Sequence, residues 1–291
     1  MLSTILRYGF FPVLLVVGNA VGISMAAAGT PLWQRIAVIV AAIVLVLWAE
    51  RALPYERAWN RDQGDTWRDI LHAGINTALN NAGILLLPLF ASFGVFSKYW
   101  PGDWPFWLQV VFAILVLDAG VTLAHYASHR FDALWRFHAV HHSVTRMYGF
   151  NGLMKHPVHQ SIETVAGMTP LLLLGIPSPV AAAVVFAVAI QLLLQHSNVD
   201  YRTGPLKYVL ANAEVHRFHH RKGAGLGNVN FGLFTMFWDH LLGTYYYSDE
   251  RVRGDTLGIE GQPDYPRAYV AQLLEPFRKR SEVEDVYGTE I

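Results

Sequence analysis

The 291-residue chain is 53% hydrophobic and only 15% charged, whereas soluble globular proteins average about 25% charged residues. This composition excludes an ordinary soluble domain and predicts an integral membrane protein. The 22 basic and 22 acidic residues cancel, so no overall positive field attracts nucleic acid, and we do not expect nucleic acid as a partner. The absence of cysteine excludes disulfides, thiolate metal sites and a cysteine nucleophile, so any metal must be held by nitrogen or oxygen.

Two apolar segments open the chain. Residues 8–34 and 36–49 contain no charged side chain, and a Gly-Thr-Pro helix breaker at 29–31 divides them, which predicts a helical hairpin. Alternatively, Arg7, the apolar stretch and the small residues before Gly29 form a secretory signal that is cleaved after Ala28. Cleavage there would leave the remaining topology unchanged, so both interpretations stay open.

Three further apolar regions follow. Residues 70–97 are free of charge and residues 104–128 carry one acid, Asp118, and each region is near the roughly 20 residues that cross a bilayer. The longest charge-free run, 164–199, is divided by the Gly175–Pro179 turn into a short and a long arm, compatible with a re-entrant hairpin or with two spans. We therefore predict an all-α integral membrane fold with about four transmembrane helices plus a membrane-associated hairpin.

Basic residues are distributed unevenly along these segments. With the amino terminus inside, the outer connections near residues 29–35, 93–105 and 175–179 hold only Arg35 and Lys98, which leaves 20 of the 22 Lys and Arg residues inside. This positive-inside asymmetry predicts a multi-pass protein whose histidine-rich segments face the cytoplasm.

Polarity also suggests how the chain is divided. We expect a transmembrane hairpin and cytosolic loop at 1–71, a catalytic domain with transmembrane helices and a cytosolic helical histidine-rich part at 72–245, and a cytosolic tail at 246–291. Within the tail, residues 267–280 have the pattern of an amphipathic helix. This helix would either pack on the catalytic domain or lie on the inner leaflet with four apolar side chains toward lipid: Tyr269, Leu273, Leu274 and Phe277.

Histidine is concentrated in one part of the chain. Eleven of the thirteen histidines fall between positions 125 and 220, mostly in the motifs HYASH (125–129), HAVHH (138–142) and HRFHH (216–220). On a helix, histidines three and four apart share a face, whereas adjacent ones diverge by about 100°, so one triplet can serve two ions. The eight motif imidazoles exceed the three or four ligands of a mononuclear site, which predicts a two-metal centre. They are His125, His129, His138, His141, His142, His216, His219 and His220.

The residues around these motifs resemble the fatty acid hydroxylase and sterol desaturase superfamily of membrane di-iron enzymes. The resemblance covers residues 118–245, and similarity to bacterial members continues at 257–259 and 273–277. It is carried by Asp118 seven residues before His125, the three histidine motifs, and the segments 134–142, 155–157, 196–198, 230–232 and 238–244.

The resemblance implies that the eight motif histidines are the core ligands and that His196 and His156 complete the metal sphere. The place of His196 at the end of the returning arm supports its role independently, although a solvated helix-end histidine is the alternative; at His156, Pro157 could simply mark a helix start. Asp118 lies two turns before His125 on the same helix face. We expect its carboxylate to orient a ligating imidazole, or else to bond to a neighbouring helix.

Two histidines depart from the family pattern. His159 stands where an acidic residue is common, and His240 stands where arginine is common. Each is an additional ligand, a replacement for a lost acidic partner, or a plain polar residue. The roles of these two and of His72 stay open.

The resemblance also implies an activity. Two iron ions and dioxygen would remove hydrogen from an unactivated C–H bond of a lipid, giving an alcohol or an alkene. No haem, flavin or nicotinamide motif is apparent, so electrons would come from a ferredoxin, reductase or cytochrome partner. We expect a bacterial inner-membrane location, with the bilayer and its lipids as partners.

Other functional classes fit the sequence less well. A zinc hydrolase would be expected to carry HExxH, and a serine hydrolase GxSxG; both motifs are absent. A metal transporter or sensor would place ionisable residues along a path through the bilayer. Here the titratable residues are predicted to gather at one face of the membrane, apart from Asp118. A b-type cytochrome would not require histidine triplets.

Overall fold

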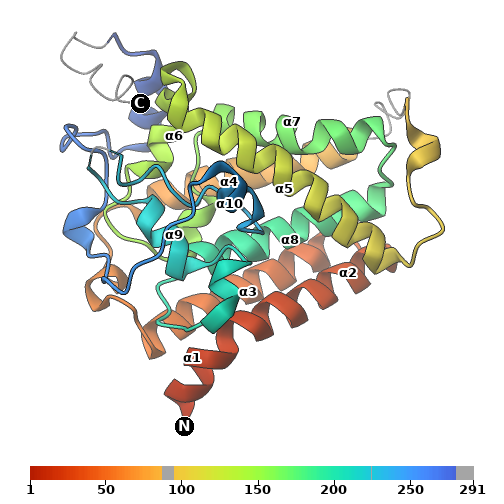
Figure 1. Ribbon diagram of the computed structural model, residues 1–291, viewed down its shortest axis with the longest axis horizontal. Helices are drawn as coiled ribbons and strands as arrows, with labels where there is room; N and C mark the ends of the chain where they lie inside the picture. Colours follow the sequence, from red (N-terminus) through yellow and green to blue (C-terminus); the bar gives the residue numbers. More distant parts are fainter. Residues whose placement is uncertain (87–94, 224, 280–291) are drawn as a thin grey trace.

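The computed structural model describes residues 1–86, 95–223 and 225–279. Within these ranges the secondary structure is helical, without strands, and three isolated β-bridges are the sole extended pairings. Long helices run side by side, and shorter helices and loops gather at one end, beside the carboxyl-terminal segment (Figure 1). The all-α architecture predicted from the sequence is confirmed.

The first two apolar segments form a helical hairpin, as predicted. The first arm consists of α1 (Leu2–Val13), a π-helical stretch (Leu14–Gly18) and α2 (Asn19–Ala27). The π-helical stretch follows Pro12, whose missing N–H disturbs the helical hydrogen-bond ladder. Gly29 then turns the chain with a φ of +63°, and α3 (Leu32–Ala52) forms the second arm.

Among the described residues four helical segments are long and apolar enough to cross a membrane, which confirms the predicted number of about four. Three match the prediction: residues 2–27, α3 and α5 (Phe106–Arg130). The fourth is α8 (Ser178–His196), the returning arm of the last hairpin. In contrast, α4 (Thr66–Leu86) does not qualify over its described length, because polar residues interrupt its apolar sequence; the rest of that predicted span, 87–94, lies outside the described residues.

Although α8 carries no charged residue, it lies at the centre of the bundle and contacts mainly protein. Within its apolar window 72% of the residues are buried inside the protein, against 17% for α3. Gly22 of α2 allows this packing, because a Cβ at that position would lie 2.2 Å from the Phe186 ring. The preceding arm, α7 (Pro157–Leu173), packs instead against α5.

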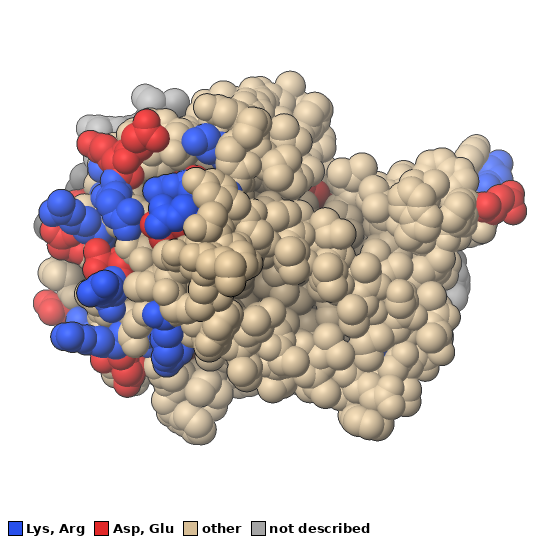
Figure 2. Space-filling view, turned by 90° about the horizontal axis from the view of Figure 1, so that it is seen from below, with Lys and Arg blue, Asp and Glu red and all other residues tan. Residues whose placement is uncertain are grey.

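Short elements complete one end of the molecule. They include α6 (Asp132–His142), η5 (Gly149–Leu153), α9 (Ala213–His219) and α10 (Phe237–Leu242). Charged side chains gather at this end, whereas the surface of the helical bundle is almost uncharged up to a small charged protrusion at the opposite end (Figure 2). This charge segregation is the pattern expected of a protein that lies mostly in a bilayer.

The predicted amphipathic helix is shorter than its sequence pattern. It consists of α11 (Tyr269–Leu274) and a 3₁₀ turn (Glu275–Phe277). Buried Gln272 attaches it to His72 of α4 and to Ser143 after α6, while Leu274 and Phe277 remain 62% and 67% exposed. The helix therefore packs on the domain, as in one of the two interpretations, and still presents apolar side chains outward.

Candidate metal centre

Nine imidazoles meet at the charged end of the bundle in two groups that lie next to each other. Each group has its ligand nitrogens within 4.8 Å of one another. One group consists of His125, His129, His138, His142 and His219. The other consists of His141, His196, His216 and His220. The prediction that one histidine triplet serves two metal positions agrees with this division.

Helix geometry explains which histidines fall together. Histidines four apart stay in the same group: 125 with 129 on α5, 138 with 142 on α6, and 216 with 220 at the end of α9. Each triplet gives its middle histidine to the other group, because an adjacent residue on a helix points about 100° away. His141 therefore joins the second group, and His219 joins the first.

The nitrogens of the first group are close enough to share an ion. Nε2 of His125 lies 3.0 Å from Nε2 of His138 and 2.9 Å from Nε2 of His219. Nε2 of His142 lies 2.9 Å from that of His138 and 3.1 Å from that of His129. Imidazole nitrogens bound at about 2.1 Å to one ion lie roughly 3 Å apart, so these separations fit a common metal.

The second group has the same spacing. Nε2 of His196 lies 3.2 Å from Nε2 of His141, 3.1 Å from that of His216 and 3.3 Å from that of His220. His196 is the last residue of α8, so the buried central helix delivers this ligand to the charged end. The expectation that His196 joins the motif histidines agrees with this position.

Backbone carbonyls orient some of these imidazoles so that their unprotonated Nε2 atoms face one another. Nδ1–H of His125 donates to the carbonyl of Phe231, and Nδ1–H of His141 donates to that of Met154. Since a carbonyl can only accept, each of these rings carries its proton on Nδ1 and presents an Nε2 lone pair inward. Lone pairs that converge at about 3 Å repel one another unless a cation lies between them, so the donor set fits metal ions.

Some of the imidazoles belong to α6 and α9, outside the membrane spans, and burial favours their neutral form. For His138, His141 and His216, removal from water lowers the pKa well below its usual value, and repulsion from neighbouring imidazoles lowers it further. Neutral imidazole is the form that binds metal, so no proton has to leave these rings at neutral pH.

His159 supports the centre from outside. Its Nε2 lies 2.8 Å from Nδ1 of His138, the nitrogen that faces away from the group, and 3.2 Å from a carboxylate oxygen of Glu163. Lys155 forms an ion pair with the same carboxylate, and all of these side chains are buried. The sequence left the role of His159 open; its spacing of four from Glu163 on one helix was the available signal.

Asp118 forms its hydrogen bonds with the loop before α10, so neither of the two partners expected for it, an imidazole or a neighbouring helix, is seen among the described residues. Its carboxylate accepts hydrogen bonds from the backbone N–H of Phe234 and from the hydroxyl of Thr235. Asp239, to which the sequence assigned no role, binds the N–H groups of Phe231 and Gly232 in the same loop. The two acids hold the loop whose Phe231 carbonyl orients His125.

His156 is not among the nine imidazoles, although the resemblance implied that it is a ligand. Its Nδ1 accepts a hydrogen bond from the N–H of Val158, which makes it the N-cap of α7. Its Nε2 lies 3.3 Å from the carbonyl of Leu273. Both nitrogens therefore have local partners, in line with the alternative that Pro157 marks a helix start.

The two histidines outside the 125–220 cluster have polar contacts of their own. His72 lies 3.0 Å from Oε1 of Gln272 and makes an edge contact with Tyr269, so it holds α11. His240 is exposed, where its Nε2–H donates to the carbonyl of Tyr208. Neither lies in a metal-binding group among the described residues.

Known proteins resemble this chain over the same region. A family model described as fatty acid hydroxylase matches residues 110–244. The ornithine lipid hydroxylase OlsE of Rhizobium tropici is 33% identical over 266 residues, which cover 87% of this chain and 78% of that protein.

More distant relatives match about half of the chain. The alkylglycerol monooxygenase of Danio rerio is 29% identical over 153 residues, which cover 53% of this chain but only 33% of that protein. The sphingolipid C4-hydroxylase sur2 of Schizosaccharomyces pombe is 30% identical over 140 residues, or 47% of each chain. No solved structure matches the chain.

Proposed function

This chain belongs to the fatty acid hydroxylase family, and we propose that it is a membrane-bound di-iron oxygenase that hydroxylates a membrane lipid. The observation that carries the proposal is the pair of adjacent all-imidazole groups at one end of a membrane-type bundle. Hydroxylation is favoured over desaturation because the relatives compared above are named hydroxylases or monooxygenases.

The donor set favours iron over zinc. Structural and catalytic zinc usually takes four ligands, whereas one group offers five imidazole nitrogens, which suits a metal with higher coordination numbers. The two groups would hold one ion each. When bound, the iron pair would supply the oxidant for R–H + O₂ + 2e⁻ + 2H⁺ → R–OH + H₂O.

The protein's own residues hold and shield this centre. The carbonyls of Phe231 and Met154 fix the orientation of two ligand rings, and His159 fixes that of His138. A small cavity beside His141 and His196 is lined by Val121 and Leu192 as well as by Lys155. The cavity holds only about 10 Å³, so these side chains close the centre off from water and would have to move to admit a carbon segment of the substrate.

Electrons would come from a separate ferredoxin, reductase or cytochrome. The charged end offers basic and acidic side chains for such a partner (Figure 2), and α6 and α9, which carry candidate ligands, lie at the same end (Figure 1). We place this end in the cytoplasm of a bacterium and the bundle in its inner membrane, because the predicted topology puts 20 of the 22 Lys and Arg residues on the inner side.

Metal analysis of the detergent-purified protein tests the centre. We expect about two irons per chain, one for each imidazole group. Stoichiometric zinc without redox activity would instead support a hydrolase, and a single weakly held ion would support a transporter or sensor; either result rejects the proposal.

Lipid analysis tests the reaction. Extracts of cells with and without the protein are compared by mass spectrometry under ¹⁸O₂. A lipid that gains one labelled oxygen only when the protein is present supports hydroxylation. A lipid that loses two hydrogens supports desaturation, and an unchanged lipid profile with iron-loaded protein contradicts both reactions.

A further inference from the structure

A second cavity lies among the long helices of the bundle, apart from the small one at the metal centre. It has a volume of about 120 Å³ and is enclosed by α3, α4, α7 and α8. Leu32 and Ile36 of α3 belong to its lining and are 38% and 45% exposed, so the cavity opens on the lipid-facing surface of the bundle. A lipid can therefore enter it from the bilayer.

Amide side chains give this cavity a polarity that a pocket for plain hydrocarbon would lack. Asn76, Asn80 and Gln160 line it among apolar residues. Asn76 is only 4% exposed, and its Nδ2 donates to the carbonyl of Lys155, whereas its Oδ1 has no hydrogen-bond partner among the described residues. An unpaired buried acceptor costs about 1–3 kcal/mol, so a ligand that supplies a donor would be favoured here.

Arg35 adds a complementary group. It lines the same cavity, and its Nε is buried without a hydrogen-bond partner in the part of the chain that the structure describes. No described carboxylate lies within ion-pairing distance of its guanidinium. Arg35 lies in the first turn of α3, at the outer interface in the predicted topology, so an anionic group of a bound lipid can form a charge-assisted hydrogen bond with it there.

The cavity leads toward the metal centre. Leu192 lines both this cavity and the small cavity beside His141, His196 and His216. Leu192 of the central helix therefore separates the two cavities where they come nearest to each other. A carbon segment of a lipid held in the first cavity would reach the ligands by displacing this side chain, because the second cavity holds only about 10 Å³.

We propose that this cavity binds a lipid substrate that carries a hydrogen-bond donor, an amide N–H or a hydroxyl, which pairs with Oδ1 of Asn76, and an anionic group, which pairs with Arg35. The inference rests on the proposed function only in taking the bound lipid as the substrate. Recognition itself depends on α3, α4 and their neighbours and does not depend on the metal ions.

Equilibrium binding to the purified full chain, with and without metal, tests the proposal. The probes are a tritiated long-chain N-acylglycine and its O-acyl glycolate ester, which have the same chain, carboxylate and shape but differ in the N–H. We expect the amide to bind about 5- to 150-fold more tightly, the range that corresponds to one unpaired acceptor. Equal affinities would overturn the proposal.

Variants test which residue causes the preference for the amide probe. Asn76→Leu is expected to bring the two affinities within about twofold of each other, while Arg35→Gln weakens both probes equally. Asn19→Leu is the control, because Asn19 also lies in a membrane helix with an unpaired Oδ1 but does not line the cavity. A preference that persists in Asn76→Leu overturns the assignment; if this variant does not fold, the amide-ester comparison on the unaltered protein decides.

The outcomes separate this inference from the proposed function. Selective binding by a protein that takes up no iron would leave the recognition site intact and reject the oxygenase. Iron-dependent hydroxylation of some lipid without any amide preference would keep the oxygenase and reject the recognition site.

Discussion

At the scale of single residues, the centre depends on which nitrogen of each ring carries the proton. The carbonyls of Phe231, Met154 and Val229 accept from Nδ1 of three histidines, so the protein fixes the tautomer before any metal arrives. Such outer contacts orient metal ligands and change metal affinity about 10- to 100-fold when they are removed. The residues outside the nine imidazoles therefore matter for the centre as well.

His141 lies in the second imidazole group whereas His156 lies in neither group, and this difference leads to a first prediction. Replacing His141 by Ala removes one of only four nitrogens of the second group, and we expect iron content to fall to about one ion per chain or less. His156→Ala is the matched control, because His156 caps α7 and lies in neither group. Iron determination on both purified variants checks this, and loss of iron in His156→Ala would restore it as a ligand.

His159 gives a second prediction. His159→Phe removes the partner of Nδ1 of His138 without opening a large space, and we expect iron affinity to fall about 10- to 100-fold. His159→Gln keeps an acceptor and should recover part of the loss. His240→Phe serves as the control on the exposed surface. Competition with a calibrated iron chelator measures the affinities, and equal values for His159→Phe and His240→Phe contradict the prediction.

The sequence could predict the motif ligands because their spacing of three and four positions is a local property of helices. His196 could also be predicted, since it ends an apolar helix on the correct side. The contacts of His159 with His138 and of Asp239 with Phe231 could not be predicted, because these partners lie 21 and 8 residues away and meet only in the folded chain. The sequence also does not distinguish the two roles of His156, because the same residue type caps a helix and binds a metal.

At the scale of elements, close helix contacts place the ligands. Gly120 of α5 faces α7, where an added Cβ would lie 2.2 Å from the carbonyl of Ala166. Backbones approach this closely only where a small residue stands at the contact. Since α5 carries His125 and α7 carries His159, which contacts His138, this helix contact sets the position of His125 relative to the support of a neighbouring imidazole.

A third prediction follows from this contact. Gly120→Ala should force the two helices apart and destabilise the protein by about 1–3 kcal/mol, because the neighbouring backbone cannot yield as a flexible side chain would. Gly74→Ala on α4 is the control: nothing lies within 4 Å of its added Cβ, and alanine favours a helix. Thermal unfolding in detergent compares the two; an unchanged midpoint for Gly120→Ala would show that the contact is not tight.

The docking of α11 predicts a dependence on pH. Burial lowers the pKa of His72 to about 4, although its hydrogen bond to Gln272 opposes the shift. When α11 is undocked, this pKa returns toward about 6.5, so the undocked form binds more protons between these values and docking weakens as pH falls from about 6.5 to 4.

Hydrogen exchange of residues 269–274, corrected for the intrinsic effect of pH, measures this docking. Protection should decrease over that range in the unaltered protein. In His72→Gln, which keeps a hydrogen-bonding side chain but cannot titrate, protection should stay constant. The same pH dependence in both proteins would assign the effect to another group.

The helices could be predicted from the length of the apolar segments, but which of these segments are candidate membrane spans could not. Residues 70–97 are free of charge, yet α4 contains Asn76, Asn80 and Asn81, and these amides face a cavity that a one-dimensional pattern does not reveal. Conversely, α8 was read as half of a hairpin because a turn precedes it, whereas packing places it at the centre of the bundle.

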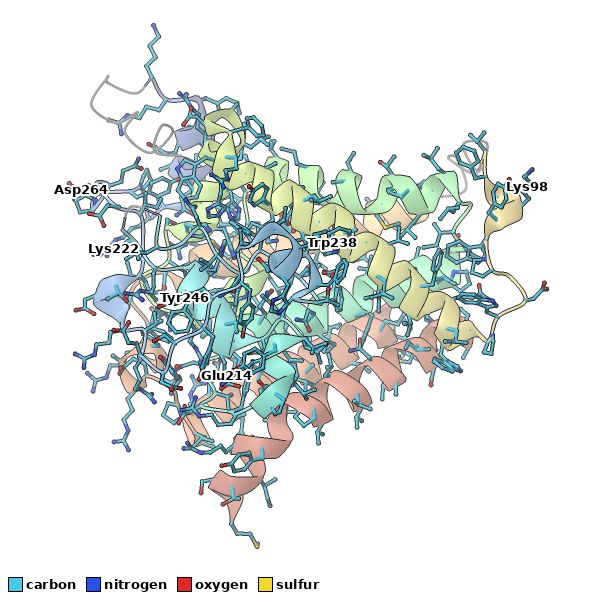
Figure 3. All side chains as sticks on the ribbon, in the orientation of Figure 1. Lys98, Glu214, Lys222, Trp238, Tyr246 and Asp264 are labelled. Carbon is cyan, nitrogen blue, oxygen red and sulfur yellow. The ribbon has the colours of Figure 1, made fainter. Side chains whose placement is uncertain are left out.

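At the scale of the whole molecule, charge and metal ligands share one end. Lys98 lies on the protrusion opposite to this end, whereas Lys222 and Asp264 lie beside the loops that follow the ligands (Figure 3). The apolar bundle between the two ends would occupy the bilayer, so the centre lies where membrane lipid and a soluble electron donor can both reach it. In the proposed orientation the charged end is cytoplasmic.

The last prediction tests that orientation with the chain's own chemistry. Because the protein has no cysteine, K98C and D264C each introduce a single thiol without background. In intact bacterial spheroplasts a membrane-impermeant maleimide should label K98C, and it should label D264C only after permeabilisation, since nearly all basic residues remain on the inner side. Labelling of D264C from outside would show that the protein has the opposite orientation, with its metal centre on the side away from cytoplasmic electron donors.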